Sequence, residues 1–154
     1  MIETRLWRSE DQADLAPLLE CFLREQVGGD LLPTARNVEL LWQLGLGFAQ
    51  QLDPCLVAFA EGQLVGYLEW GAPTVGFECA LKTLHTFGAY VVPAQRHARV
   101  AVALRAEALV RAVELGYERV VGPVGLQNEP GIQHFIHEYG AWPTTVQFEY
   151  RLGA

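Results

Sequence analysis

Alternating and helically spaced apolar positions divide the chain into short segments that predict a succession of strands and helices. Six segments are rich in apolar and β-branched residues and are expected to form strands: residues 2–7, 55–60, 64–70, 86–92, 119–123 and 144–152. Four segments repeat apolar residues at helical spacing or carry helix signals: about residues 10–25, 34–52, 96–115 and 130–139. The order β-α-α-β-β-β-α-β-α-β predicts a mixed α/β fold.

Cap and turn residues set the expected ends of several segments. Ser9 and Gln12 have the spacing of a capping box at the start of the first helix. The short loop around Gly62 predicts a hairpin between two strands, and Gly116 supplies the stop for the third helix. Residues 71–84 contain turn residues and are expected to be irregular.

Composition indicates one globular domain over residues 1–154, because 51% of the residues are hydrophobic and 19% are charged. The formal net charge is -7, and Lys82 is the one lysine, so nucleic acid and anionic membranes are not expected as partners. Cys21, Cys55 and Cys79 have neither disulfide nor metal-ligand spacing and are expected to be small buried residues, with no metal bound. The N-terminus lacks the order of a signal peptide, which favours a cytoplasmic protein.

The third predicted helix combines an apolar face with a basic start. Its inward positions are expected to be Ala101, Leu104, Ala108, Ala112 and Leu115, and its polar positions Glu107, Arg111, Glu114 and Glu118. Residues 96–111 hold four Arg and one Glu in an otherwise acidic chain. A helix N-terminus offers unpaired N–H groups and partial positive charge, so this start is a candidate phosphate site, although a run of Arg is also typical of a solvated helix face.

Residues 91–104 resemble the acetyl-CoA-binding motif of the GNAT superfamily of N-acetyltransferases, in which Gln or Arg is followed by two residues, Gly, one residue, and Gly or Ala. Arg96 takes the first position and Ala101 the last, and Arg99 stands where the family has Gly. Residues 124–141, with Asn128 before a short helix, resemble the family's second motif. The hairpin at residues 57–67 is similar to the family's second and third strands. The resemblance therefore spans nearly the whole chain.

The resemblance implies a single GNAT-like domain with a mixed, mostly antiparallel central sheet flanked by helices. It implies direct transfer of an acyl group from acetyl-CoA to an amine of a small molecule or peptide. Thioester contacts are expected from Val91 or Val92. The expected phosphate contacts come from the loop and helix start, namely Arg96, His97, Ala98, Arg99, Val100 and Ala101, and Asn128 joins the cofactor contacts.

Arg99 leaves three interpretations open. Glycine would permit a close backbone approach or a positive φ, which Arg disfavours. The Arg99 side chain could instead pair with a phosphate oxygen, or it could close the pocket and abolish CoA binding.

The catalytic groups are less clearly indicated. Where the family commonly has a Tyr that protonates the leaving thiolate, this chain has Phe135 or Ile136, and Tyr139 one turn later is the nearest substitute. Glu69 is the favoured base, because a carboxyl on a buried strand has a raised pKa, although an outward-facing carboxylate fits the pattern equally well. Glu78 and His85 are further base candidates, His134 and His137 are expected at the surface, and Trp42 and Trp70 are core residues or line an acceptor pocket.

Two other functions are compatible with the sequence. One is a non-catalytic GNAT-fold module that binds CoA or supports an oligomer, and a homodimer through residues 144–152 is one such possibility. The other is a nucleotide-binding domain, which the missing Gly-Lys-Ser/Thr and Gly-x-Gly-x-x-Gly loops disfavour. An acidic surface suits a cationic amine acceptor.

Overall fold

The computed structural model describes residues 1–26, 34–40, 55–71, 82–96 and 99–122, and then residues 132–133, 136–138 and 140–142. The chain divides into two compact units, Met1–Pro123 and Val124–Ala154. In the second unit, residues 132–133 and 136–138 are helical, within the helix predicted for residues 130–139. The strand predicted at residues 144–152 lies outside the described residues, and one domain over residues 1–154 stays a prediction.

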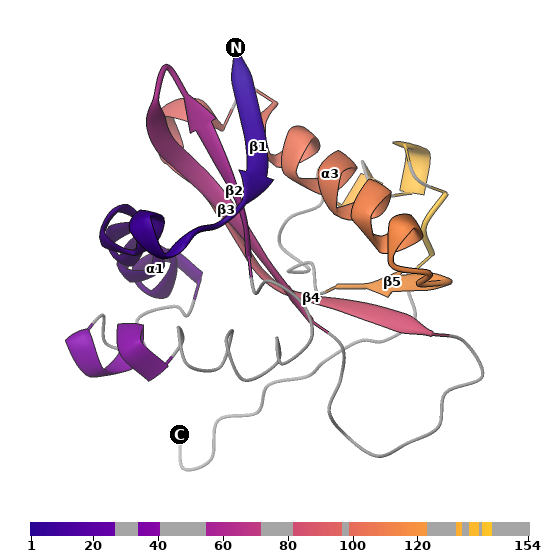
Figure 1. Ribbon diagram of the computed structural model, residues 1–154, viewed down its shortest axis with the longest axis horizontal. Helices are drawn as coiled ribbons and strands as arrows, with labels where there is room; N and C mark the ends of the chain where they lie inside the picture. Colours follow the sequence, from indigo (N-terminus) through magenta and orange to yellow (C-terminus); the bar gives the residue numbers. More distant parts are fainter. Residues whose placement is uncertain are drawn as a thin grey trace, which may run out of the picture. The chain divides into compact units, whose positions relative to one another are not determined.

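The first unit is built on a five-stranded sheet with the strand order β1-β2-β3-β4-β5 (Figure 1). The strands are β1 (Ile2–Leu6), β2 (Cys55–Ala60), β3 (Gln63–Gly71), β4 (Thr83–Val91) and β5 (Arg119–Val121). The first four pair antiparallel, and β5 pairs parallel to β4. The predicted mostly antiparallel sheet is therefore confirmed.

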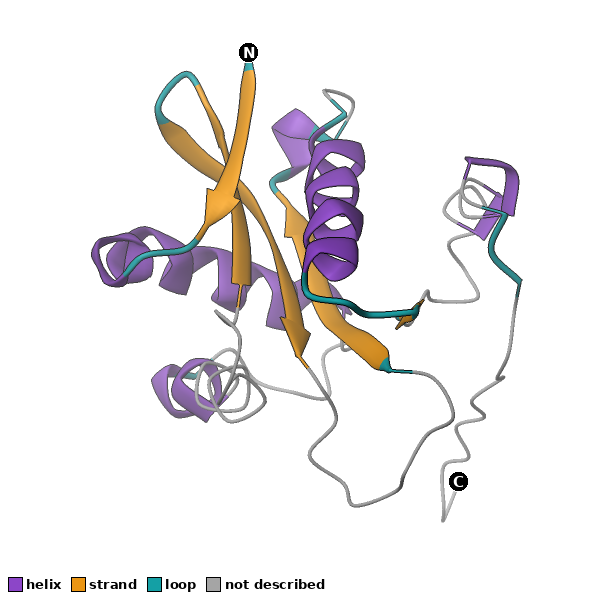
Figure 2. Cartoon of the chain, turned by 45° about the vertical axis from the view of Figure 1, so that its right-hand side comes forward, coloured by secondary structure: helices purple, strands orange, loops and turns teal. Residues whose placement is uncertain are grey.

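Helices lie on both faces of this sheet, as Figures 1 and 2 show. α1 (Gln12–Gln26) covers a cluster that includes Tyr67 and Tyr90, and α3 (Val100–Glu114) covers one that includes Leu68 and Trp70. Successive residues of β3 thus point to opposite, buried faces, which explains its nearly continuous apolar sequence. Residues 35–40 are also helical, and the hydroxyl of Thr34 caps them by accepting the Asn37 N–H at 3.2 Å.

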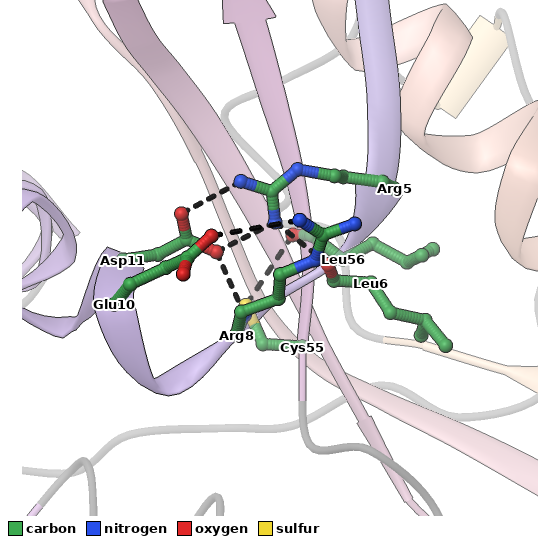
Figure 3. A network of polar contacts seen from close by, with 7 residues as sticks. All are labelled: Arg5, Leu6, Arg8, Glu10, Asp11, Cys55 and Leu56. Carbon is green, nitrogen blue, oxygen red and sulfur yellow. Dashed lines mark hydrogen bonds and ion pairs between the residues drawn. The ribbon is translucent and has the colours of Figure 1, made fainter.

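Asp11 organises the junction between β1 and α1 (Figure 3). Both its carboxylate oxygens accept hydrogen bonds of 2.7 Å from the Arg5 guanidinium, and Oδ2 also accepts the Arg8 N–H at 2.7 Å. A 3₁₀ turn, Ser9–Asp11, precedes α1. The predicted capping box of Ser9 and Gln12 is therefore wrong. The N-cap is Arg8, and its backbone N–H is bound by the carboxylate of Asp11, which Arg5 holds in place.

Two other predicted boundaries are also wrong. β4 begins at Thr83, not at residue 86, because its first three residues pair with β5. α3 begins at Val100, not near residue 96, because a 3₁₀ turn, Pro93–Gln95, and a left-handed Arg99 come first.

Most expected core positions are confirmed. Leu104, Ala108 and Ala112 are buried on the inner face of α3, whereas Leu115 is 40% exposed because α3 ends one residue before it. Trp70 is 1% exposed within the core beside α3, so it does not line an acceptor pocket. Cys55 is buried as predicted.

Some expectations are wrong or lie outside the described residues. Cys21 is exposed on α1 and is not the small core residue expected. Cys79 and Trp42 lie outside the described residues. Within the part of the chain that the structure describes, no helix is long and apolar enough to span a bilayer.

Candidate functional site

The outer edge of β4 is open along its second half. β5 pairs with β4 only from Thr83 to His85, and no other strand of the described residues pairs with this edge. The Val92 N–H donates to the Val65 carbonyl of β3 at 2.9 Å. Because successive N–H groups of a strand point to opposite sides, those of Val91 and Ala89 point away from β3, toward the open edge. Of the two residues expected to contact the thioester, Val91 has an N–H that faces the open edge, whereas the N–H of Val92 is bonded to Val65.

The start of α3 lies next along the chain from this edge. Its first α-helical hydrogen bond runs from the Ala103 N–H to the Arg99 carbonyl, at 3.0 Å. The N–H groups of Val100 and Ala101 come before that bond and have no carbonyl partner within α3. Unpaired amides at a helix N-terminus favour an anion such as a phosphate.

Arg99 has the conformation that the motif's glycine would be expected to supply. Its φ is 62° and its ψ is 19°, in the left-handed region, immediately before α3. Arg99 therefore adopts the positive φ that an arginine disfavours, at a strain cost of about 1 kcal/mol. Arg99 is exposed, and its guanidinium has no ion pair within the described part of the chain. Its charge is available to an anion at the helix start.

Arg96 is engaged by neighbouring protein groups. Its guanidinium forms an ion pair with Glu25 at the end of α1, and its Nε donates to the Val91 carbonyl at 3.1 Å. Tyr90 completes this network, because its hydroxyl donates to Glu25 Oε1 at 2.9 Å and its ring centre lies 5.6 Å from the Arg96 guanidinium. The Arg96 N–H is used as well, by the Pro93 carbonyl at 3.3 Å. The phosphate contact expected of Arg96 is therefore not free in this arrangement.

The pKa values in this network follow from its contacts. Burial opposes ionisation of Glu25, yet the hydrogen bonds from Arg96 and Tyr90 outweigh it and lower the pKa of the carboxyl. Burial and the carboxylate of Glu25 together raise the pKa of Tyr90 to about 12. Glu25 is therefore an anion and Tyr90 a neutral donor at neutral pH. The positive charge of residues 96–111 is reduced further, because Arg111 forms an ion pair with Glu107 at 2.7 Å.

Glu69 lies inside the fold beside the second half of β4. It is 6% exposed, so it is buried and does not face outward, and burial raises the pKa of its carboxyl to about 7. Its Oε2 lies 2.9 Å from where a Cβ on Gly88 would be, and Phe22 of α1 is the next neighbour of that position. Tyr67, two residues earlier on β3, is fully buried, and its hydroxyl has no hydrogen-bond partner among the described residues. A carboxyl that titrates near neutrality can accept a proton from an amine.

The other candidates are distributed as follows. His85 lies on β4 six residues before Val91, about 20 Å along the strand, and burial and Arg119 lower its pKa. Ile136 is 37% exposed and His137 is exposed, in the second unit. The remaining predicted residues lie outside the described residues: His97, Ala98, Glu78, Asn128, His134, Phe135 and Tyr139. Among the residues described, no group of three or more His, Cys, Asp or Glu side chains could hold a metal ion.

Sequence reasoning missed Glu25, Tyr90, Gly88 and Ala89. Glu25 and Tyr90 are 65 positions apart, and no local pattern connects them. Gly88 could have been noticed as a glycine inside a predicted strand, which often marks a close approach of another group. Ala89 would have followed from the alternation of N–H groups once the strand's partner was known.

Comparison with known proteins identifies the fold. No family model matches the sequence and no curated protein matches it. A ribosomal-protein-alanine N-acetyltransferase from Brucella melitensis biovar Abortus 2308 matches with a TM-score of 0.69 and 19% identity, over 99% of this chain and 100% of that one. The acetyltransferase AAC(6')-Iy, bound to a CoA-containing bisubstrate analogue, matches with a TM-score of 0.72 and 16% identity, over 100% and 99% of the two chains.

A third structure carries the acyl donor itself. It is a GNAT family acetyltransferase from Brucella melitensis in complex with acetyl-CoA, with a TM-score of 0.62 and 21% identity over 85% of this chain and 82% of that one. These similarities show that the chain has the fold of the GNAT acetyltransferases. The fold that the sequence resemblance implied is confirmed.

Proposed function

We propose that the protein is an acetyl-CoA-dependent N-acyltransferase that transfers an acyl group directly to an amine of a small molecule or peptide. The observation that supports this most strongly is the continuity of three features: the N-terminus of α3, the open edge of β4, and the buried carboxyl of Glu69 beside Gly88. Acetyl-CoA bound at the helix start and along that edge would direct its acyl end toward Gly88. Several of the structural neighbours are acetyltransferases, which supports the same reaction class.

The residues present suit such a donor. Acetyl-CoA supplies an activated acyl group on a thiolate that leaves readily. The amides of Val100 and Ala101, with the Arg99 side chain, would bind the phosphates. The outward amides of Ala89 and Val91 would hydrogen-bond the extended arm and the thioester carbonyl, at an edge where no strand of the described residues competes.

Glu69 would act as the base. With a pKa of about 7, its carboxyl is ionised in a substantial fraction of molecules at neutral pH and can take the proton of an incoming ammonium group. The pKa of a free alkyl ammonium is near that of lysine, so the acceptor must lose a proton before its nitrogen can attack the acyl carbon. Tyr139 remains the proposed acid for the departing sulfur, and solvent can supply that proton in its place.

The acceptor is proposed to be cationic. The chain has a formal net charge of -7, which concentrates ammonium compounds and repels polyanions. Phe22 and Tyr67 lie near Glu69 with their ring centres 6.2 Å apart, so the carboxyl is beside aromatic surface that also favours an alkyl ammonium.

Two measurements test this proposal together. Acetyl-CoA at a hundred times its Kd should stabilise the protein by about 2.7 kcal/mol, seen as a rise in Tm. Free thiol should then appear when a panel of primary amines is added, and Glu69→Gln should reduce its rate while Glu3→Gln, on the exposed face of β1, leaves it unchanged. Binding without turnover with any amine would favour the non-catalytic CoA-binding module. No change in Tm with acetyl-CoA, propionyl-CoA or free CoA would refute acyl-CoA binding.

A further inference from the structure

Glu25 connects two parts of the molecule that are far apart in sequence. It lies in the last turn of α1, and its carboxylate binds the hydroxyl of Tyr90, at the end of β4, and the guanidinium of Arg96, in the loop before α3. Tyr90 is 4% exposed, so one arm of the network is anchored in the core. Arg96 is the exposed arm, and it lies in the turn that follows β4.

The contacts of Arg96 restrict this loop at both ends. Its Nε donates to the Val91 carbonyl, and its backbone N–H donates to the Pro93 carbonyl, so the chain from Val91 to Arg96 forms a closed turn against β4. Arg99, which precedes α3, follows three positions later in the sequence. Glu25 therefore holds Arg96 in place, and with it the turn from Val91 to Arg96.

The network also neutralises the positive charge of Arg96 beside the open edge of β4. An unpaired guanidinium at position 96 could swing across this edge, because its Nε already reaches the carbonyl of Val91. Glu25 holds it on the side of α1 and neutralises it. The amides of Ala89 and Val91 and the charge of Arg99 then remain available for a ligand.

We propose that Glu25 is a positioning residue for the turn Val91–Arg96, which lies beside the proposed acyl-CoA site, and that it acts through Arg96 and Tyr90 without contact with the ligand. This inference rests on the proposed acyl-CoA binding.

The first experiment compares two Glu-to-Gln variants on the same helix. Glu25→Gln removes the charge that holds Arg96, and Glu20→Gln removes an ion pair with Arg24 that lies elsewhere on α1. Glu25→Gln should raise the Kd and the KM for acetyl-CoA about threefold to fivefold and leave kcat unchanged, the range expected for a partly exposed pair. Glu20→Gln should change neither. Unchanged Kd in Glu25→Gln would overturn the proposal.

A double-mutant cycle tests whether Glu25 acts through Arg96. Arg96→Gln removes the guanidinium, and in that background Glu25→Gln should have no further effect on the Kd for acetyl-CoA. The same loss in both backgrounds would mean that Glu25 acts by another route and would refute this assignment.

A ligand-free measurement separates this inference from the proposed function. Amide hydrogen exchange at Gln95 and Arg96, whose N–H groups bond to Val92 and Pro93, should speed up in Glu25→Gln and not in Glu20→Gln. Faster exchange would support the positioning role even in a protein that binds no acetyl-CoA. In that case the missing binding would refute only the proposed function. Unchanged exchange would refute the positioning role even where acetyl-CoA binds.

Discussion

Replacing Glu69 with Gln should make the protein more stable at alkaline pH, by an amount that the pKa shift fixes. Burial raises the pKa of Glu69 from 4.5 to about 7. Below pH 4.5 the carboxyl is protonated in the folded and unfolded states alike. As the pH rises from there, the unfolded chain releases this proton first, so the folded state loses stability until the pH passes about 7. The shift corresponds to about 3 kcal/mol of unfolding free energy.

Glutamine has nearly the shape of a protonated glutamic acid and does not ionise, so Glu69→Gln should avoid this loss. The variant should match the wild type at about pH 4 and exceed its unfolding free energy by up to about 3 kcal/mol near pH 8. Urea denaturation followed by tryptophan fluorescence, repeated between about pH 4 and pH 9, measures the difference directly. Glu3→Gln is the matched control, because the Glu3 side chain is exposed on β1 and its loss should change stability by less than about 0.5 kcal/mol.

The reasoning is refuted if the difference between Glu69→Gln and the wild type does not change with pH, or if the variant is the less stable protein near pH 8. Either result would mean that the folded chain solvates or pairs the carboxylate. The prediction also links stability to activity. The substitution that stabilises the fold at alkaline pH removes the proposed base, so the same variant should transfer acyl groups more slowly.

Substitutions at three other positions test further contacts of the fold. Arg99→Gly should keep the left-handed turn and raise the unfolding free energy by up to about 1 kcal/mol, whereas Arg99→Val should lower it, as thermal denaturation will show. Gly66→Ala should destabilise by about 1–3 kcal/mol in urea denaturation, because the new Cβ would lie 2.9 Å from the Tyr90 carbonyl oxygen. Asp11→Asn should cost about 2 kcal/mol at neutral pH, since it leaves Arg5 without its partner. The lowered pKa of Asp11 means that this difference disappears as the pH falls through the folded-state value, which denaturation at acid pH will measure.

The sheet and the helices could be predicted from the sequence wherever the signal was local. β2, β3 and α3 follow from runs of apolar residues and from helical spacing, and the predicted inner positions Leu104, Ala108 and Ala112 of α3 are buried, whereas Leu115 is exposed. The start of β4 could not be predicted, because Thr83 belongs to the strand only through its pairing with Arg119, whose Nε also donates to the Thr83 hydroxyl at 3.1 Å. A partner 36 positions away leaves no trace in the local pattern.

The candidate site also has one property that the sequence predicts and one that it does not. The burial of Glu69 and its raised pKa follow from a carboxyl among apolar strand residues, and the structure agrees. The phosphate contact expected of Arg96 rested on the motif resemblance and on the sign of its charge, and that charge is neutralised by Glu25, 71 positions earlier. Charge counted along a segment therefore overstates the field at a site, because the counter-ions come from other elements of the fold.

Arg99 shows why a motif is better compared by backbone conformation than by residue identity. The resemblance had its weakest point there, because the family has glycine. Glycine matters at such a position because it reaches positive φ at no steric cost, and Arg99 reaches φ 62° all the same. The surrounding fold must impose this conformation, since arginine has no preference for it. Two features can do so. The ion pair between Arg96 and Glu25 anchors the turn before Arg99, and Val100, which follows Arg99, is buried in the core. Glu61, between β2 and β3, also has a positive φ of 52°, so a left-handed residue in this chain marks a tight turn and does not by itself indicate a ligand at the start of α3.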